Sequence, residues 1–240
     1  MIVGMTKTQL KRAIGIIGKQ IERIDLDFAS GLLKAEAVER IMNRFVVDLE
    51  RTKCELERHE PPRKGNWMAT YTGVRFWPLD ARGYEIYIRD IAHALAGKTR
   101  FGGHARAFYS VAQHSVMVAD NLPKEYALIG LMHDATEAYV GDMVRPLKRC
   151  MPEFVKAEFA LAQVIGKRFG LGSKLAKLPA KVVEADGRAL MTERRDLINH
   201  LDFVWREDLE PFEQKITPLS PEDAERLFLR RFRELYQEAK

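Results

Sequence analysis

The sequence predicts an all-α fold with one short extended segment. Apolar residues recur every three to four positions over most of the chain, which is the spacing of the buried face of a helix. Proline or a capping serine stands just before several of these stretches, where such residues favour a helix start. Residues 67–78 mix β-branched and aromatic side chains with a glycine and a proline, which predicts a strand pair or an extended arm.

The N-terminal residues predict an antiparallel helical hairpin. Thr6 caps a first helix that has apolar residues at positions 10, 14, 17 and 21. Residues 25–31 predict a break before a second amphipathic stretch over residues 35–49, which ends in a run of charges. The hairpin is short of catalytic residue types. We therefore interpret it as a packing or oligomerisation appendage, with a regulatory or partner-binding role as the alternative.

A proline-rich break divides the predicted domains. The sequence from Pro61 to Asn66 predicts a loop, so we place a helical appendage in residues 1–60 and the main domain in residues 61–240. The main domain continues with a short helix over residues 88–96 and a loop rich in arginine and glycine. Further helices are predicted over residues 110–121, 123–140, 152–169 and 182–203, and from Pro221 onward.

Composition and charge predict a cytoplasmic protein. The net charge is +5, and the basic residues are spread over helix faces without the interleaved aromatics that single-stranded nucleic acid requires. No apolar run approaches the roughly 18–20 residues that span a bilayer, and the N-terminus lacks the pattern of a signal peptide. Cys54 and Cys150 are far apart, so neither a disulfide framework nor a cysteine zinc site is expected. We expect no stable nucleic-acid partner and no membrane attachment.

Histidine and aspartate residues on three predicted helices form a candidate metal site. His114 lies in the helix after Ser110, the pair His133-Asp134 lies in the next helix, and Asp186 lies near the start of the long one. Imidazole nitrogen and carboxylate oxygen suit divalent transition ions. Each residue alone has a structural explanation, such as a hydrogen-bonded core histidine or a helix-start carboxylate. Their joint occurrence within apolar helices, where an unpaired charge is costly, favours a metal site.

Two acidic residues follow the His-Asp pair. Glu137 stands four residues after His133, which predicts the same helix face one turn along. There it could orient water, accept a proton from water or protonate a leaving group, and the alternative is a solvated helix glutamate. Gly141 interrupts the helix, and Asp142 either bonds a substrate hydroxyl or caps the next turn.

The pattern His114 … His133-Asp134 … Asp186 resembles that of the HD-domain metal phosphohydrolases. The flanking sequences strengthen the resemblance, and they are similar to the branch that contains bacterial 5′-deoxynucleotidases. Related phage and bacterial proteins include deoxynucleoside triphosphate hydrolases. The resemblance covers roughly residues 70–205. The matching sequences are Ser110-Val-Ala-Gln-His114-Ser, Leu131-Met-His-Asp-Ala-Thr-Glu137, Gly141-Asp142 and Glu184-Ala-Asp186.

This resemblance implies an HD-domain helical core around one divalent ion, which would be cobalt, manganese, nickel, zinc, iron or magnesium. It implies that His114, His133, Asp134 and Asp186 hold the ion and that Glu137 acts in catalysis with water on the ion. Those 5′-deoxynucleotidases have Arg-Trp where this chain has Arg-Phe, so the base selectivity stays open. The resemblance also implies a homo-oligomer. The expected substrate contacts are Arg100, which would also serve in catalysis, Phe101, His104, Asp142 and Lys148.

The sequence leaves several functions open. The first hypothesis is hydrolysis of (deoxy)nucleotides, most simply of a 5′-deoxynucleoside monophosphate to nucleoside and phosphate. A deoxynucleoside triphosphate hydrolase in nucleotide-pool control is the first alternative. Another HD enzyme, acting on cyclic nucleotides or alarmones, is the second, although no histidine lies between His133 and His200 to hold the second metal of cyclic dinucleotide enzymes. A non-catalytic HD interaction module is the alternative from another class.

Overall fold

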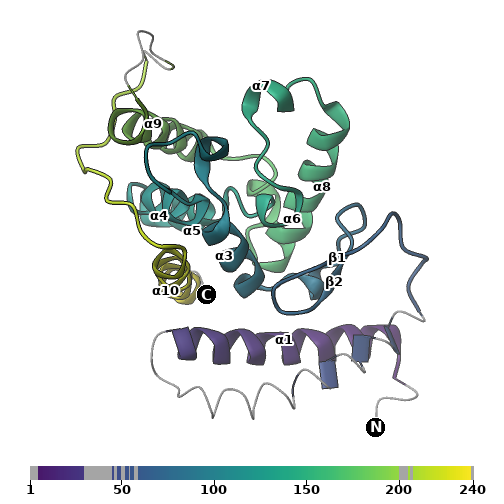
Figure 1. The fold of residues 1–240 in the computed structure, drawn as a ribbon. Helices are drawn as coiled ribbons and strands as arrows, with labels where there is room; N and C mark the ends of the chain where they lie inside the picture. Colours follow the sequence, from purple (N-terminus) through teal and green to yellow (C-terminus); the bar gives the residue numbers. More distant parts are fainter. Residues whose placement is uncertain are drawn as a thin grey trace. The chain divides into compact units, whose positions relative to one another are not determined.

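The chain folds into helices with little strand, which confirms the predicted all-α class (Figure 1). The computed structural model describes residues 5–29, 59–199 and 208–238, together with residues 45, 48, 49, 52, 53, 55, 56 and 205. The chain divides into two compact units, an N-terminal unit of residues 1–89 and a C-terminal unit of residues 90–240. Among the helices described, none combines the length and the apolar character needed to cross a membrane.

Helix α1 (Lys7–Ala29) opens the N-terminal unit. The backbone N–H of Gln9 donates to the hydroxyl of Thr6 at 3.3 Å, so the predicted cap is confirmed. The predicted break at residues 25–31 is wrong for its first five positions, because the helix continues to Ala29. No glycine or proline stands in those five positions to end the helix, and residues 30 and 31 lie outside the described part of the chain.

The two predicted arms of the N-terminal hairpin share one apolar core. The seven described residues between positions 45 and 56 are all helical. Their Leu49 and Leu56 are buried in the same cluster as Leu10, Ile14 and Ile21 of α1. Residues 30–44, which include the expected turn and the start of the second arm, lie outside the described residues. The assignment of residues 1–60 as a separate appendage stays a prediction.

The predicted extended segment forms a small hairpin. Strands β1 (Met68–Ala69) and β2 (Arg75–Phe76) pair antiparallel, with Met68 opposite Phe76, which confirms the predicted strand pair. A 3₁₀ turn, η1 (Gly83–Glu85), follows. Arg63 lies with its guanidinium 4.2 Å from the centre of the Trp77 ring and forms an ion pair with the buried Glu85. This ion pair ties the loop before the hairpin to the turn after it.

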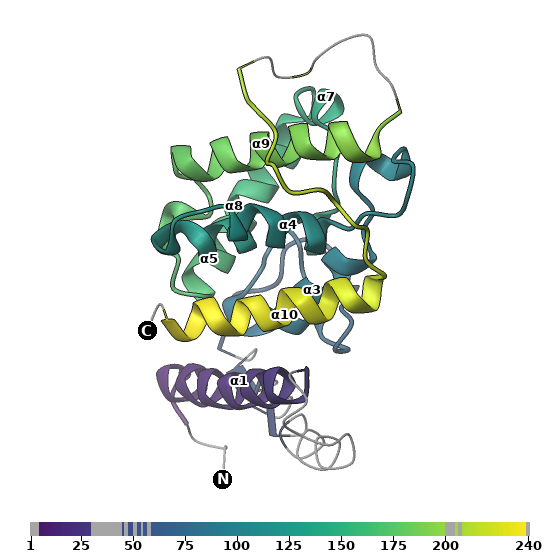
Figure 2. The same ribbon diagram turned by 90° about the vertical axis from the view of Figure 1, so that its left-hand side faces the viewer.

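Helices α4, α5, α9 and α10 form the centre of the C-terminal unit. Helix α4 packs against α5, α9 and α10, and Figure 2 shows it between α9 and α10. Aromatic side chains of α10 are buried in this unit. The ring of Phe232 packs edge-on against the ring of Phe169, and the two ring centres are 5.5 Å apart. The elements in chain order are α3 (Ile88–Gly97), η2 (Arg100–Gly103), α4 (Val111–Asp120), α5 (Lys124–Met132), α6 (Glu137–Val140), α7 (Arg145–Lys148), α8 (Pro152–Arg168), η3 (Gly172–Lys174), α9 (Ala180–Leu197) and α10 (Pro221–Glu238).

Two predicted helices differ from those observed. The helix expected over residues 123–140 is two helices, because α5 ends at Met132, the N–H groups of Ala135 and Glu137 donate three residues back, and α6 begins only at Glu137. The helix expected to reach residue 203 ends at Leu197, since Ile198 is extended. The backbone carbonyl of Leu197 accepts a hydrogen bond from the N–H of Arg106, which fixes the end of α9 against the preceding loop.

Candidate metal centre

A short antiparallel pairing places the start of α4 beside Arg100. Arg100 N–H donates to the Tyr109 carbonyl at 2.8 Å, and Val111 N–H donates to the Lys98 carbonyl at 3.0 Å. Ser110 then caps α4 by accepting a hydrogen bond from Gln113 N–H at 3.1 Å, as predicted. His114 follows one turn later and is fully buried. The position of Arg100 relative to His114 is therefore fixed by backbone hydrogen bonds.

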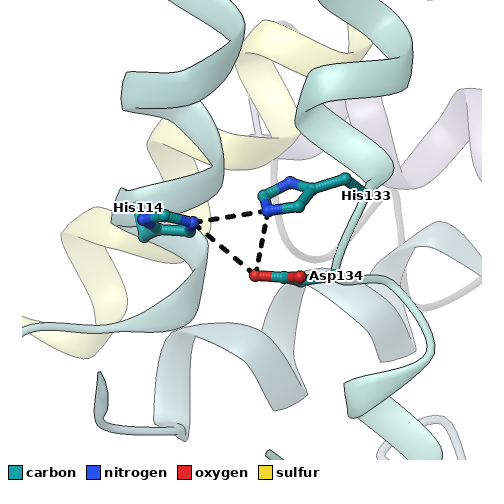
Figure 3. Close-up of side chains that lie close together, drawn as sticks. All are labelled: His114, His133 and Asp134. Atoms are coloured by element: carbon teal, nitrogen blue, oxygen red, sulfur yellow. Dashed lines mark hydrogen bonds and ion pairs between the residues drawn. The ribbon is translucent and has the colours of Figure 1, made fainter. Parts of the chain in front are cut away.

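A close approach of α4 and α5 brings the two histidines together. Gly130 lies against α4, where an added Cβ would meet the Leu122 side chain at 2.4 Å and contact Val118. Its carbonyl accepts a hydrogen bond from His133 Nδ1 at 2.7 Å. As a result, His133 directs its Nε2 toward α4 from the end of α5, and the Nε2 atoms of His114 and His133 lie 3.3 Å apart (Figure 3).

Two aspartates complete a group of four donors. Asp134 Oδ2 lies 3.2 Å from His133 Nε2 and 3.7 Å from His114 Nε2 (Figure 3). Asp186 Oδ1, from the second turn of α9, lies 3.3 Å from His114 Nε2 and 3.8 Å from His133 Nε2. Bonds of about 2.1 Å to one ion place neighbouring ligands roughly 3.0–3.4 Å apart. These spacings suit a divalent ion, and His114, His133 and Asp134 alone could hold one.

The orientation of both imidazoles also fits a metal. His114 Nδ1 lies 2.5 Å from Glu193 Oε1, and the carbonyl that faces His133 Nδ1 can only accept. With both protons on Nδ1, both Nε2 atoms carry lone pairs, and these atoms face one another across 3.3 Å. Metal-binding histidines have this arrangement, with the second ring nitrogen donating to a carboxylate or a carbonyl.

The charges around the cluster favour a cation at its centre. Burial disfavours the charged form of His133, but Asp134 and Asp186 outweigh it and raise the pKa of His133 well above its usual value. The pKa of Asp186 lies well below its usual value, because its hydrogen bonds to His114 and His133 outweigh burial. Protons on the imidazoles and a divalent ion would relieve the same negative charge, so they compete for this site.

Glu193 joins the cluster to Arg100. It is fully buried on α9, and its Oε2 accepts from Arg100 Nη2 at 2.9 Å while Oε1 faces His114. Arg100 is 13% exposed, and its Nη1 lies 3.9 Å from Asp134 Oδ2, beyond hydrogen-bond distance. The guanidinium predicted from the sequence thus lies at the edge of the donor group. Its role in phosphate binding stays a prediction.

Glu137, which the sequence predicts on the same helix face as His133, lies close to the cluster. The single helix on which this prediction relied is interrupted, because residues 133–136 form turns and the N–H of Glu137 donates to the Asp134 carbonyl, three residues back. Glu137 is buried, and its Oε2 has no hydrogen-bond partner among the residues that the structure describes. Burial, together with the charges of Asp134 and Asp142, raises its pKa well above the usual value.

Asp142 and Lys98 lie near Glu137. The prediction that Asp142 caps the next turn is wrong, because α7 begins after Val144 without a side-chain cap. Burial raises the pKa of Asp142 and lowers that of Lys98, and the Lys98 ammonium feels the charges of both Glu137 and Asp142. The structure therefore adds a half-buried lysine to the predicted acidic group.

Helix α7 contributes one basic side chain to the cluster and directs another away. Arg145 Nη2 lies 3.7 Å from Asp186 Oδ2, on an exposed side chain. Lys148 donates to Glu158 Oε1 of α8 at 2.6 Å, so part of its charge is already offset. A phosphate contact of Lys148 stays a prediction.

The loop after Arg100 is tightly turned. Phe101 has φ of 57°, in the left-handed region that disfavours side chains other than glycine, and two glycines with positive φ follow it. The Phe101 ring lies 5.8 Å from that of Trp205. His104 is exposed. The substrate roles of Phe101 and His104 stay predictions.

Comparison with known proteins relates the chain to proteins without an assigned function. It is 38% identical to the uncharacterized protein YfdR of Escherichia coli over 173 residues, which cover 71% of this chain and 96% of YfdR. The chain belongs to the same family as YfdR. It is also 34% identical over 132 residues to the uncharacterized protein RCAP_rcc00048 of Rhodobacter capsulatus, covering 51% of this chain and 66% of that protein. No protein-family model matches the chain.

Sequence reasoning missed Glu193, Lys98 and Arg145. Glu193 stands seven residues after Asp186, which is two helical turns, so both lie on one face of α9. That spacing, and a glutamate within an otherwise buried helix face, could have indicated it. Lys98 and Arg145 had no comparable pattern, because their nearness to Asp142 and Asp186 depends on how the loops fold back.

Proposed function

We propose that the protein is a metal-dependent phosphohydrolase of the HD type that converts (deoxy)nucleoside 5′-monophosphates to nucleoside and phosphate. One observation carries the proposal. The Nε2 atoms of His114 and His133 face each other at 3.3 Å, with carboxylates of Asp134 and Asp186 within 3.2–3.8 Å. A divalent ion bound by these residues would activate water for attack on phosphorus and offset charge on the phosphoryl group.

Arg100 is suited to the substrate phosphate. Glu193 orients its guanidinium, and Nη1 lies on the side of Asp134, where it has no hydrogen bond to any of the residues that the structure describes. Arginine donors match phosphate oxygens in a two-point geometry. A guanidinium fixed in this way also stabilises charge that develops on the phosphoryl oxygens without having to reorganise during the reaction.

Glu137 is suited to protonate the leaving group. Burial and the charges of Asp134 and Asp142 raise the pKa of Glu137 well above its usual value, which favours the protonated form that an acid needs. In the proposed reaction the water oxygen attacks phosphorus, the P–O5′ bond breaks, and O5′ takes the proton of Glu137. The proton that the water releases restores the glutamic acid. In this proposal Asp142, whose side chain is exposed, accepts a hydrogen bond from a sugar hydroxyl.

The test is release of phosphate by the purified protein with Co²⁺ or Mn²⁺ added. The panel contains dAMP, dGMP, dTMP, AMP and the corresponding triphosphates, and chromatography resolves the products. Turnover of monophosphates to nucleosides is the expected result. Turnover restricted to triphosphates would replace the proposal with triphosphate hydrolysis, and metal binding without turnover of any nucleotide would contradict it.

The Glu137→Gln variant sharpens this test. It keeps the size of the side chain and removes its acidic proton, so we expect turnover to fall by about 10²- to 10⁴-fold while Co²⁺ still binds. Glu184→Gln is the matched control, because Glu184 is an exposed glutamate on α9. Activity of Glu137→Gln within about threefold of the unmodified protein would show that Glu137 is not the general acid.

A further inference from the structure

Glu193 is the buried acid that connects two parts of the candidate site. It has no exposed surface, and its two oxygens have different partners. Oε1 lies 2.5 Å from Nδ1 of His114, and Oε2 accepts from Nη2 of Arg100 at 2.9 Å. Each oxygen therefore faces a different cationic or donating group, and neither is left for solvent.

The contact with Glu193 favours a proton on Nδ1 of His114. A carboxylate at Nδ1 keeps the proton there, which leaves a lone pair on the Nε2 that faces His133, Asp134 and Asp186. A metal ion requires that lone pair. The contact with Arg100 has a separate effect, since it holds Nη1 3.9 Å from Asp134.

We propose that Glu193 is a positioning residue shared by the metal site and the anion site, so that binding of a divalent ion and binding of a phosphate group both depend on this carboxylate. The inference rests on the proposed metal centre, but it does not require that the protein hydrolyse nucleotides. It assigns to Glu193 a role that neither the His-Asp pattern nor its spacing contains.

Glutamine cannot replace both contacts. Its amide has a single acceptor oxygen, and its NH₂ group only donates. If the oxygen faces Arg100, the NH₂ group faces His114 Nδ1 and favours a proton on Nε2, where it blocks a metal ion. If the oxygen faces His114, the NH₂ group faces the guanidinium and Arg100 loses its anchor. In either orientation, the glutamine keeps only one of the two contacts that the carboxylate makes.

The experiment measures Co²⁺ binding by calorimetry for the unmodified full chain, Glu193→Gln and the control Glu184→Gln. Inorganic phosphate is then titrated into each metal-saturated protein. We expect Glu193→Gln to bind Co²⁺ about 10- to 100-fold more weakly, which is the usual effect of removing a partner of a metal ligand. Phosphate affinity should fall by about fivefold or more as Arg100 loses its anchor. Glu184→Gln should stay within about twofold of the unmodified protein in both titrations.

Other outcomes would overturn the proposal. If Glu193→Gln binds Co²⁺ within about twofold of the unmodified protein, Glu193 has no role at the metal site. Weaker Co²⁺ binding with unchanged phosphate binding would show that the carboxylate does not serve both sites. Co²⁺ binding without any nucleotide turnover would contradict the proposed function and leave this inference intact, so the two failures are distinguishable.

A measurement on the unmodified protein covers the case in which Glu193→Gln does not fold. Long-range ¹H–¹⁵N correlation spectra of the chelator-treated protein report which nitrogen of His114 carries the proton. A proton on Nδ1 with a bare Nε2 is the expected result for neutral His114. A neutral ring protonated on Nε2 would overturn the proposal, because Glu193 would then fail to set the tautomer.

Discussion

The pair Arg63–Glu85 in the N-terminal unit and the pair Arg100–Glu193 in the C-terminal unit both bury a glutamate against an arginine, and they differ in how the guanidinium is used. Arg63 and Arg100 are 14% and 13% exposed, and their partners Glu85 and Glu193 are 3% and 0% exposed. Arg63 donates to both oxygens of Glu85, to the Asp80 carbonyl and to the Tyr84 hydroxyl. Arg100 instead donates to one oxygen of Glu193, and its Nη1 keeps donor capacity beside Asp134.

The two glutamates also respond differently to burial. Burial raises the pKa of Glu85 to about 7, and the opposing charge of Arg63 offsets only part of this. The pKa of Glu193 is lowered despite complete burial, because Arg100 and His114 both stabilise its charge. An arginine whose two terminal nitrogens both donate to the protein supports the fold. One that keeps donors beside a cluster of metal-ligand types is suited to a ligand.

The largest effect is expected for Arg100→Gln. If the proposed function holds, loss of the guanidinium charge removes stabilisation of the phosphoryl group, and kcat/KM should fall by about 10²- to 10³-fold. Kinetic assays with the best monophosphate of the panel measure this, with Arg63→Gln as the matched control. Equal losses in the two variants would show that the comparison does not separate a ligand-binding arginine from a structural one.

A large effect on stability is expected for Arg63→Gln. Removing one partner of a buried ion pair leaves the other without compensation, and we expect the free energy of unfolding of the N-terminal unit to fall by about 3 kcal/mol at pH 8. Because Arg63 stacks on Trp77, tryptophan fluorescence during urea unfolding reports on this region. Hydrogen exchange of residues 63–87 localises the change, and unaltered protection there would contradict a structural role for the pair.

The pH dependence of stability should have opposite signs for the two glutamates. Glu85 binds a proton more tightly when folded, so its contribution is present below about pH 4.5 and is lost as the pH rises toward 7, by roughly 3 kcal/mol. Glu193 has a lowered pKa, so its contribution is present above about pH 4.5 and is lost as the pH falls through the folded pKa. Urea unfolding from pH 3 to 8 with a chelator present measures both contributions.

The corresponding variants separate these two contributions. Glu85→Gln should flatten the stability profile between pH 5 and 7, whereas Glu193→Gln should flatten it below pH 4.5. If Glu85→Gln does not change how the free energy of unfolding varies between pH 5 and 7, then Arg63 keeps Glu85 charged in the folded protein.

A small effect is expected for Ser110→Ala. The variant removes the cap of α4, and we expect the C-terminal unit to lose about 1 kcal/mol of stability. The backbone pairing that places Arg100 beside Ser110 does not use the hydroxyl, so phosphate binding should change by less than about threefold. Thermal unfolding and phosphate titration measure the two effects. A large loss of phosphate binding would show that the cap, and not the backbone pairing, fixes Arg100.

The sequence alone determined the helical class and the residues of the donor group. Apolar periodicity depends on neighbouring residues in one chain segment, so it predicted α1, α4, α8 and α10 without knowledge of packing. Likewise, the cost of burying an unpaired charge made His114, His133, Asp134 and Asp186 conspicuous within apolar helices. The Ser110 cap was also predictable, because its hydrogen bond spans only three residues and depends on local sequence alone.

Only the tertiary structure decided how these residues meet. No local pattern in residues 123–140 marks the break between α5 and α6. The partnership of Glu193 with both His114 and Arg100 joins residues 79 and 93 positions apart in sequence. Such contacts depend on the close approach of α4, α5 and α9, which is set by side-chain packing over the whole unit. The sequence therefore supplies the candidate ligands, whereas packing decides which carboxylate orients them and which guanidinium keeps a donor for a ligand.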